Sequence, residues 1–142
     1  MSTRKKPLFG AFFLHKFKIC MKVSMIKPLS LIIMSWFYIA VGISHYTDPN
    51  WFVQIVPPYL PFKLELVYVS GFFEIIFGLM LILPSWRYYA GWGLILLLIA
   101  VYPANIYLAQ TNGAAMNTSA LVAWGRLPFQ FLFIGIAYWH TK

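Results

Sequence analysis

Acidic residues are scarce in this chain of 142 residues: Asp48, Glu65 and Glu74 face eleven lysines and arginines, and the net charge is +8. Charged residues of both signs make up 10% of the chain and hydrophobic residues 61%. A soluble domain has about 25% charged and about 45–50% apolar residues. A short chain also buries too small a fraction of its surface to hide such an apolar excess in a soluble core. The composition therefore predicts a membrane protein.

Cysteine is equally scarce, since Cys20 stands alone. A single thiol excludes a disulfide within the chain and the paired cysteines of thiol–disulfide enzymes. No pair of histidine, cysteine or acidic residues has the spacing of a metal site, so no metal is expected. His45 and His140 are expected at opposite faces of a ~30 Å layer, which excludes shared ligation of one haem iron. The glycine-rich motifs of nucleotide-binding proteins and serine hydrolases are absent as well.

Four apolar runs are long enough to cross a bilayer as helices, which takes about 20 residues. They cover residues 29–45, 64–83, 89–109 and 119–139, and the first extends back toward Met25. The runs are too long for strands and show no period of two, and lipid leaves helices as the structure that satisfies the backbone. Pro28 stands where the start of a helix tolerates proline, and Pro84 follows the second run. The expected fold is an all-α membrane protein, an antiparallel bundle of four transmembrane helices formed by residues 28–142.

Residues 1–27 are predicted to be a basic arm that is either disordered or lies on the membrane surface. An alternative for the following run is a signal peptide cleaved near Ala40, Val41 and Gly42, but its long basic leader and the interfacial Trp36 and Tyr38 favour a retained helix. Basic residues set the orientation of such a bundle. Seven of them precede the first span: Arg4, Lys5, Lys6, Lys16, Lys18, Lys22 and Lys27.

The connection after the third span has no charge, whereas the one after the second contains Arg87 and the chain ends in Lys142. We therefore expect both termini in the cytoplasm and the protein in a bacterial inner membrane. Basic patches also bind nucleic acid, but here the basic residues flank a span instead of covering a fold, so no nucleic-acid partner is expected.

Each predicted span carries a stripe of polar or small residues at helical spacing. The stripes of the first two spans consist of Ser35, Tyr38, Gly42 and His45, and of Gly71, Glu74 and Gly78. Those of the third and fourth consist of Gly91, Leu98, Tyr102, Asn105 and Ala109, and of Arg126, Gln130 and Ile134. Together they predict a polar cluster in the outer half of the bundle, formed by His45, Glu74, Tyr102, Asn105, Arg126 and Gln130.

Glu74 raises the question of what compensates a carboxylate inside an apolar helix. At a rise of 1.5 Å per residue, Glu74 lies about 15 Å and Arg126 about 10 Å from the same membrane face. An isolated charge at the centre of a membrane helix costs about 2.5–3.5 kcal/mol. We therefore predict a buried ion pair between Glu74 and Arg126, with Asn105 and Gln130 supplying further hydrogen bonds. By itself, His45 is expected to be an interfacial residue rather than a catalyst.

Several stretches together resemble the DoxX family of small four-helix bacterial membrane proteins. They are "ISHYTDPNWFVQIVPPYLP", "LVYVSGFFEIIFGLMLILP", "AGWGLILLLIAVYPANIYLA" and "RLPFQFLFIGIAYW", and the resemblance covers residues 29–139. Its motifs are the glutamate of "GFFEIIFG", the "PANIY" stretch and the "RLPFQ" stretch. The resemblance implies an inner-membrane protein, in some members a subunit of a thiosulfate–quinone oxidoreductase and in others a membrane partner of redox or detoxification enzymes.

Three functions stay open at this stage. The first is a redox-associated membrane subunit that binds a quinone or a partner oxidoreductase through the polar cluster, with Trp36, Tyr102 and Trp124 as aromatic walls. The second is a small transporter or binder of a lipid-like ligand, which for transport would need a homo-oligomer because four helices enclose little volume. The third is a membrane scaffold, in which the polar residues only hold the helices together. No residue carries electrons by itself, so the chain is expected to be at most an accessory subunit.

The topology can be tested with reporter fusions at Asn112 and Lys142. With four spans and both termini in the cytoplasm, the fusion at Asn112 should report the outside and the fusion at Lys142 the cytoplasm. Reports from the same side would contradict the four-span arrangement.

Overall fold

A computed structural model describes the backbone of residues 8–142 and the side chains of residues 25–142. It contains five α-helices and one 3₁₀ helix: α1 (Leu8–Thr47), α2 (Pro49–Val53), α3 (Lys63–Ile82), α4 (Arg87–Gln110), η1 (Ala114–Met116) and α5 (Ala120–His140). Four segments are long and apolar enough to span a membrane: Met25–Thr47, Lys63–Ile82, Arg87–Gln110 and Ala120–His140. The predicted all-α fold with four membrane helices is confirmed, and no strand occurs in residues 8–142.

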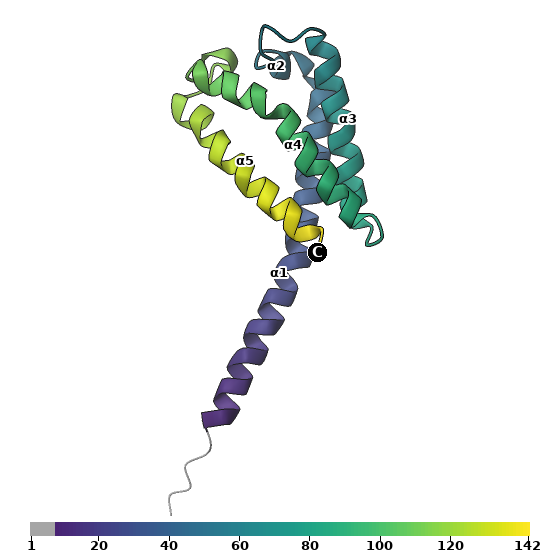
Figure 1. Cartoon of the computed structure of the whole chain (residues 1–142), viewed down its shortest axis with the longest axis vertical. Coiled ribbons are helices and arrows are strands. Elements are labelled where there is room, and N and C mark those ends of the chain that lie inside the picture. Colours follow the sequence, from purple (N-terminus) through teal and green to yellow (C-terminus); the bar gives the residue numbers. More distant parts are fainter. Residues whose placement is uncertain (1–7) are drawn as a thin grey trace, which may run out of the picture.

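The helix that contains the first span is longer than the sequence suggested. Pro28 lies inside α1 instead of at its start, and α1 continues back to Leu8, while residues 1–7 of the predicted arm lie outside the described part. An internal proline removes one backbone hydrogen bond, and membrane helices tolerate this because local adjustment satisfies the freed carbonyl. Residues 8–27 therefore extend α1 by about 30 Å, at 1.5 Å per residue, away from the other helices (Figure 1).

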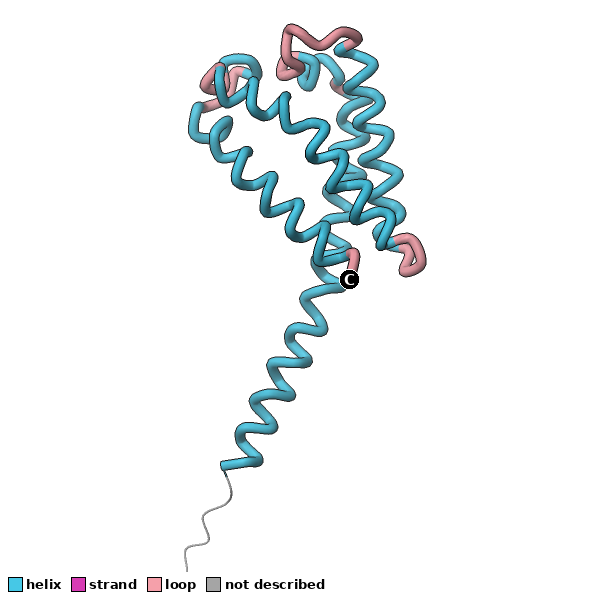
Figure 2. The backbone as a smooth tube through the Cα atoms, in the orientation of Figure 1, coloured by secondary structure: helices cyan, strands magenta, loops and turns pink. Residues whose placement is uncertain are grey.

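The connections between helices use local turn chemistry. The hydroxyl of Ser119 accepts a hydrogen bond from the backbone nitrogen of Val122 at 3.3 Å and so caps the start of α5. Gly113, just before η1, has φ 85°, and a Cβ there would collide with the carbonyl oxygen of Thr118. These features turn the chain between α4 and α5 within a short connection (Figure 2).

The long helices pack as two antiparallel pairs, α1 with α3 and α4 with α5, and the pairs join where α3 packs against α4. We call the end of the bundle with the C-terminus and the α3–α4 connection the terminal end, and the opposite end the loop end. At the terminal end α5 reaches α1, where Ser30 Oγ lies 3.1 Å from His140 Nε2. Toward the loop end the two helices separate (Figure 1).

Two apolar clusters hold the pairs together. The larger one, the terminal core, consists of Leu31, Met34, Tyr38, Leu81, Ala90, Leu94, Ile95 and Ala137. The smaller one, the loop-end core, consists of Ile55, Leu108, Met116 and Ala123. Ile55 follows α2, so the connection between α1 and α3 reaches across the bundle to cover α4 and α5. The six residues of the predicted polar cluster lie on the loop side of the terminal core.

Small residues bring α1 and α3 into close contact, as the predicted stripes indicated. A Cβ on Gly42 would lie 2.7 Å from the carbonyl oxygen of Gly71, and one on Gly78 would lie 3.1 Å from the carbonyl oxygen of Ser35. The hydroxyl of Ser35 donates to the carbonyl oxygen of Gly78 at 2.5 Å. Glycine and serine at such contacts let membrane helices approach until their backbones touch.

Replacing Gly42 by alanine should lower the melting temperature of the protein in detergent, because the added methyl group must push α1 and α3 apart. Overpacking of this kind costs about 1–3 kcal/mol. Gly135→Ala is the matched control, since a Cβ on Gly135 meets nothing within 4 Å. It removes a glycine from a membrane helix in the same way and should be neutral or stabilising. Equal losses from both substitutions would show that backbone contact between α1 and α3 is not what Gly42 provides.

Candidate functional site

The six residues predicted to form one polar cluster are all buried or half-buried, but the structure divides them. His45 and Glu74 meet between α1 and α3, and we call them the His–Glu pair. Asn105, Arg126 and Gln130 meet between α4 and α5, and we call them the amide network. Tyr102 is half-buried on α4, where its ring packs edge-on against Phe131 at 5.7 Å. Each group therefore belongs to one helix pair.

The His–Glu pair is the most deeply buried ionisable contact in residues 25–142. His45 is 6% exposed and Glu74 is 8% exposed, and His45 Nδ1 lies 3.2 Å from Glu74 Oε2. The same nitrogen lies 2.9 Å from the carbonyl oxygen of Val41. Because both neighbours of Nδ1 are acceptors, Nδ1 carries the proton and Nε2 is the nitrogen that can take up or release another. The arrangement is an imidazole that is held at Nδ1, beside a buried carboxylate, and that keeps Nε2 for another partner.

Two buried polar atoms at or near this pair form no hydrogen bond with the described groups. Glu74 Oε2 and the hydroxyl of Tyr38 are both buried. The N–H at Nδ1 of His45 is directed to the carbonyl oxygen of Val41, so Glu74 Oε2 lies within ion-pair distance of Nδ1 without accepting a hydrogen bond from a described group. The Tyr38 hydroxyl has no hydrogen-bond partner among the described groups either. Tyr38 lies on the same stripe of α1 as His45, close enough to Glu74 for the carboxylate charge to act on it. A buried polar atom without a partner is uncommon and needs an explanation. A ligand that donates a hydrogen bond to the carboxylate would provide one.

An aromatic ring from α2 covers the pair on one side. The ring of Phe52 stacks on the ring of His45 with centroids 3.7 Å apart and planes 20° apart. Asp48 precedes α2, and Pro49 starts it, so this short helix turns directly after α1 and places Phe52 over the histidine. Phe52 thereby keeps water from one face of the imidazole, which strengthens its interaction with the carboxylate.

The predicted ion pair between Glu74 and Arg126 is wrong. Glu74 lies on the face of α3 that Gly71 and Gly78 bring against α1, whereas Arg126 lies on the face of α5 that packs on α4. The prediction placed both charges at similar depth, but it assumed that α3 and α5 face each other. In the structure α5 pairs with α4, so the arginine finds an amide oxygen and the glutamate finds a histidine.

The amide network is a chain of directed hydrogen bonds. Arg126 Nε donates to Asn105 Oδ1 at 3.1 Å, and Asn105 Nδ2 donates to Gln130 Oε1 at 2.6 Å. Gln130 Nε2 then donates to the carbonyl oxygen of Leu98. Asn105 thus contacts Arg126 as expected, but Gln130 contacts Asn105 and Leu98 instead, and neither amide contacts Glu74. Each amide is fixed in one orientation because its oxygen accepts and its nitrogen donates.

Arg126 is left without a counter-ion in this network. No carboxylate forms an ion pair with it among residues 25–142, and its other contact is a weak one from NH1 to Met116 Sδ at 4.0 Å. A guanidinium has five donors and stays charged in proteins. The remaining donors can therefore bind an anionic or carbonyl oxygen of a ligand near the loop end of α5.

For two of the three residues, the prediction that they form aromatic walls of the site is wrong. Trp36 is 73% exposed and Trp124 is 53% exposed, so both face away from the bundle. The aromatic residue that does contact the His–Glu pair is Phe52, which sequence reasoning did not assign. Facing glycines could have identified the His–Glu pair, because Gly42 lies one turn from His45 and Gly71 one turn from Glu74. Their contact brings the two polar side chains together.

The two possible partners of Glu74 can be separated by double-mutant cycles. Glu74→Gln combined with His45→Gln should show a coupling of about 0.5–3 kcal/mol in stability in detergent, as is found for residues in contact. Glu74→Gln combined with Arg126→Gln should be additive within about 0.5 kcal/mol. Strong coupling in the second cycle would contradict the arrangement described above.

Comparison with curated proteins and with solved structures gave no match. The model of one family, described as "Domain of unknown function (DUF8561)", matches residues 34–141. The matched region begins within α1 and runs to the end of α5, so it includes the His–Glu pair, the amide network and both apolar cores. On the strength of this match, the chain belongs to the DUF8561 family.

Proposed function

We propose that this protein is a DoxX-like, redox-associated membrane subunit that binds a quinone headgroup near the loop end of the bundle. The observation that carries the proposal is the buried His–Glu pair, in which Glu74 Oε2 has His45 Nδ1 at ion-pair distance but accepts no hydrogen bond from a described group. Intramembrane ionisable groups are functional candidates by default because their burial is costly.

The chemistry of the pair suits a carrier that exchanges protons when it is reduced or oxidised. A quinone takes up two electrons and two protons to form a quinol, and a partner oxidoreductase supplies or removes the electrons. His45 can hold or release one proton at Nε2, and Glu74 stabilises the charged imidazole. Imidazole is the side chain whose ordinary pKa suits it to act as an acid or base at physiological pH.

The amide network would orient the ligand rather than move protons. Arg126 has donors that no carboxylate occupies, and Asn105 and Gln130 hold its Nε in place. A positively charged donor stabilises the negative charge that develops on a carbonyl oxygen during reduction. The loop-end core covers this region with Ile55 and Met116, which helps to exclude water from it.

The proposed orientation places the terminal end in the cytoplasm of a bacterial inner membrane. Lys27, Arg87 and Lys142 lie toward this end, whereas Lys63 lies toward the loop end together with Asp48 and Glu65. This distribution agrees with the positive-inside rule. The quinone site would then lie in the outer half of the membrane, and a partner oxidoreductase would reach it from that side.

A second candidate function is the binding of a lipid-like ligand without electron transfer. A specific observation favours it: an apolar cavity of about 260 Å³ lies between α1 and α5, apart from the His–Glu pair and the amide network. Transport through such a small bundle would need a second copy of the chain.

The quinone proposal can be tested with the reduced form of a short-chain quinone, the quinol, because its hydroxyl groups can donate to Glu74, whereas the carbonyl oxygens of a quinone only accept hydrogen bonds. The purified protein in detergent is titrated with the quinol, and the quenching of tryptophan fluorescence is followed. Glu74→Gln and His45→Gln should each weaken binding about tenfold or more, because a hydrogen bond that involves a charged group contributes about 1.5–3 kcal/mol. The matched control is Glu65→Gln, which removes an exposed carboxylate from the first turn of the same helix and should bind as the unchanged protein does.

Two results would contradict the proposal. One is the absence of saturable quenching in the unchanged protein. The other is an equal affinity of the Glu74 and Glu65 variants, which would leave the His–Glu pair as a structural contact between α1 and α3.

A further inference from the structure

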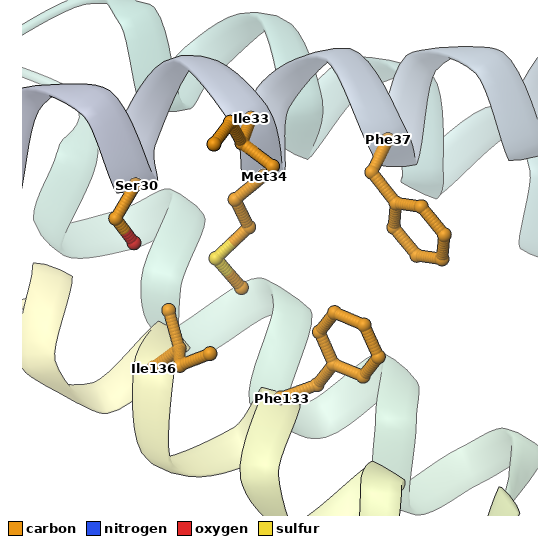
Figure 3. A pocket seen from close by; sticks show the side chains of 6 residues that line it. All are labelled: Ser30, Ile33, Met34, Phe37, Phe133 and Ile136. Carbon is orange, nitrogen blue, oxygen red and sulfur yellow. The ribbon is translucent and has the colours of Figure 1, made fainter.

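The cavity between α1 and α5 has a nearly apolar wall with one hydroxyl. Its lining consists of Ser30, Ile33, Met34, Phe37, Phe133 and Ile136. Figure 3 shows Ser30 and Ile136 near one end and the rings of Phe37 and Phe133 near the other. These two rings stack with centroids 5.2 Å apart and planes 9° apart, which closes that end. Ile33 is 59% exposed, so the cavity opens sideways to the surroundings of the helices.

The shape and chemistry of the cavity suit one acyl chain. Ser30 and Phe37 are seven residues apart on α1, which corresponds to about 10 Å along the helix. An apolar void that stays empty forfeits van der Waals contacts along its whole lining. In a bilayer, a lipid tail can fill the cavity and restore those contacts.

Two cationic side chains, Lys27 and Arg87, lie at the end of the bundle where Ser30 lines the cavity. Lys27 lies one turn before Ser30 on α1, and its Nζ lies 6.0 Å from the ring centroid of Trp139. Arg87 is fixed at the start of α4, because its Nε donates to the carbonyl oxygen of Leu81 at 3.0 Å. All three acidic residues of the chain occur between positions 48 and 74, so none lies at this end to neutralise these charges.

His140 connects the cations with the cavity. It is 3% exposed, and its Nε2 lies 3.1 Å from the hydroxyl of Ser30. Its Nδ1 is buried and has no partner among the described groups. Lys27 approaches the ring of Trp139, the residue before His140. Arg87 lies one turn before Gly91, where α4 touches α5 at Ala137 and Thr141 on either side of His140. A buried nitrogen without a partner, beside two cations and an apolar cavity, indicates a site for a molecule with an anionic head and an apolar tail.

We propose that this end of the α1–α5 cavity binds an anionic phospholipid. Its phosphate would lie by Lys27 and Arg87, next to the Ser30–His140 contact, and one acyl chain would fill the cavity toward Phe37 and Phe133. The headgroup of phosphatidylcholine carries its own cation, which Lys27 and Arg87 would repel. The site therefore prefers phosphatidylglycerol. The site is separate from the His–Glu pair and does not depend on the quinone proposal.

The test is native mass spectrometry of the protein in a mild detergent with equal amounts of phosphatidylglycerol and phosphatidylcholine. The unchanged protein should retain one phosphatidylglycerol in preference to phosphatidylcholine. Lys27→Gln should weaken this retention about fivefold, as expected for the loss of one basic residue near an anionic lipid. Lys63→Gln is the matched control, since it removes the same charge at the loop end and should retain the lipid fully.

A second variant tests the cavity itself without changing any charge. Ile136→Trp fills the space between α1 and α5 and should reduce the retention of phosphatidylglycerol at least as much as Lys27→Gln. Circular dichroism of each variant shows whether the helices remain folded, and Ile33→Trp, on the exposed rim of the cavity, replaces Ile136→Trp if that variant unfolds.

Four results would overturn the proposal. They are equal retention of the two lipids, equal losses in the Lys27 and Lys63 variants, full retention in the folded cavity variant, and thermal stabilisation by inorganic phosphate alone that equals the effect of the lipid. Cross-linking between α1 and α5 of two copies, or a partner chain that covers the cavity, would show instead that the cavity between α1 and α5 belongs to an interface between proteins.

Discussion

Backbone contact between α1 and α3 is the constraint on which the site depends. Gly42 and Gly71 let the two helices touch, and His45 and Glu74 follow one turn away on the same faces. With larger residues at the glycine positions, the helices would stand further apart and the imidazole would not reach the carboxylate. A buried carboxylate without a partner would then have to take up a proton or leave the membrane interior. Close packing therefore determines both the stability of the pair and its charge.

The bundle separates its polar groups from one another by pairing its helices. The His–Glu pair lies within α1 and α3, the amide network within α4 and α5, and apolar cores lie at both ends. The contacts of Glu74 with His45 and of Asn105 with Arg126 and Gln130 thus each stay within one pair of helices. In lipid this arrangement is favourable because apolar surroundings strengthen hydrogen bonds that are made and penalise those that are not.

The two ends of the bundle offer different chemistry. Near the loop end, a protonatable pair and an arginine without a counter-ion lie under the cover of α2 and the loop-end core, which suits a ligand that gains or loses protons. Near the terminal end, cations and a buried histidine border an apolar cavity, which suits an anionic lipid.

The amino-acid sequence by itself determined the environment, the number of spans and the faces of the helices, because length, hydropathy and helical spacing are local properties. The stripes with Gly42 and Glu74, and the hydrogen bonds of Asn105 with Gln130, follow from such spacing once neighbouring helices are known. Three features did not follow from the sequence: the partner of Glu74, the outward position of Trp36 and the continuation of α1 through Pro28. Which face of one helix meets which face of another depends on how all four pack together. Two charges at equal depth can therefore lie in different helix pairs, and only the tertiary structure decided that Glu74 meets His45 while Arg126 meets Asn105.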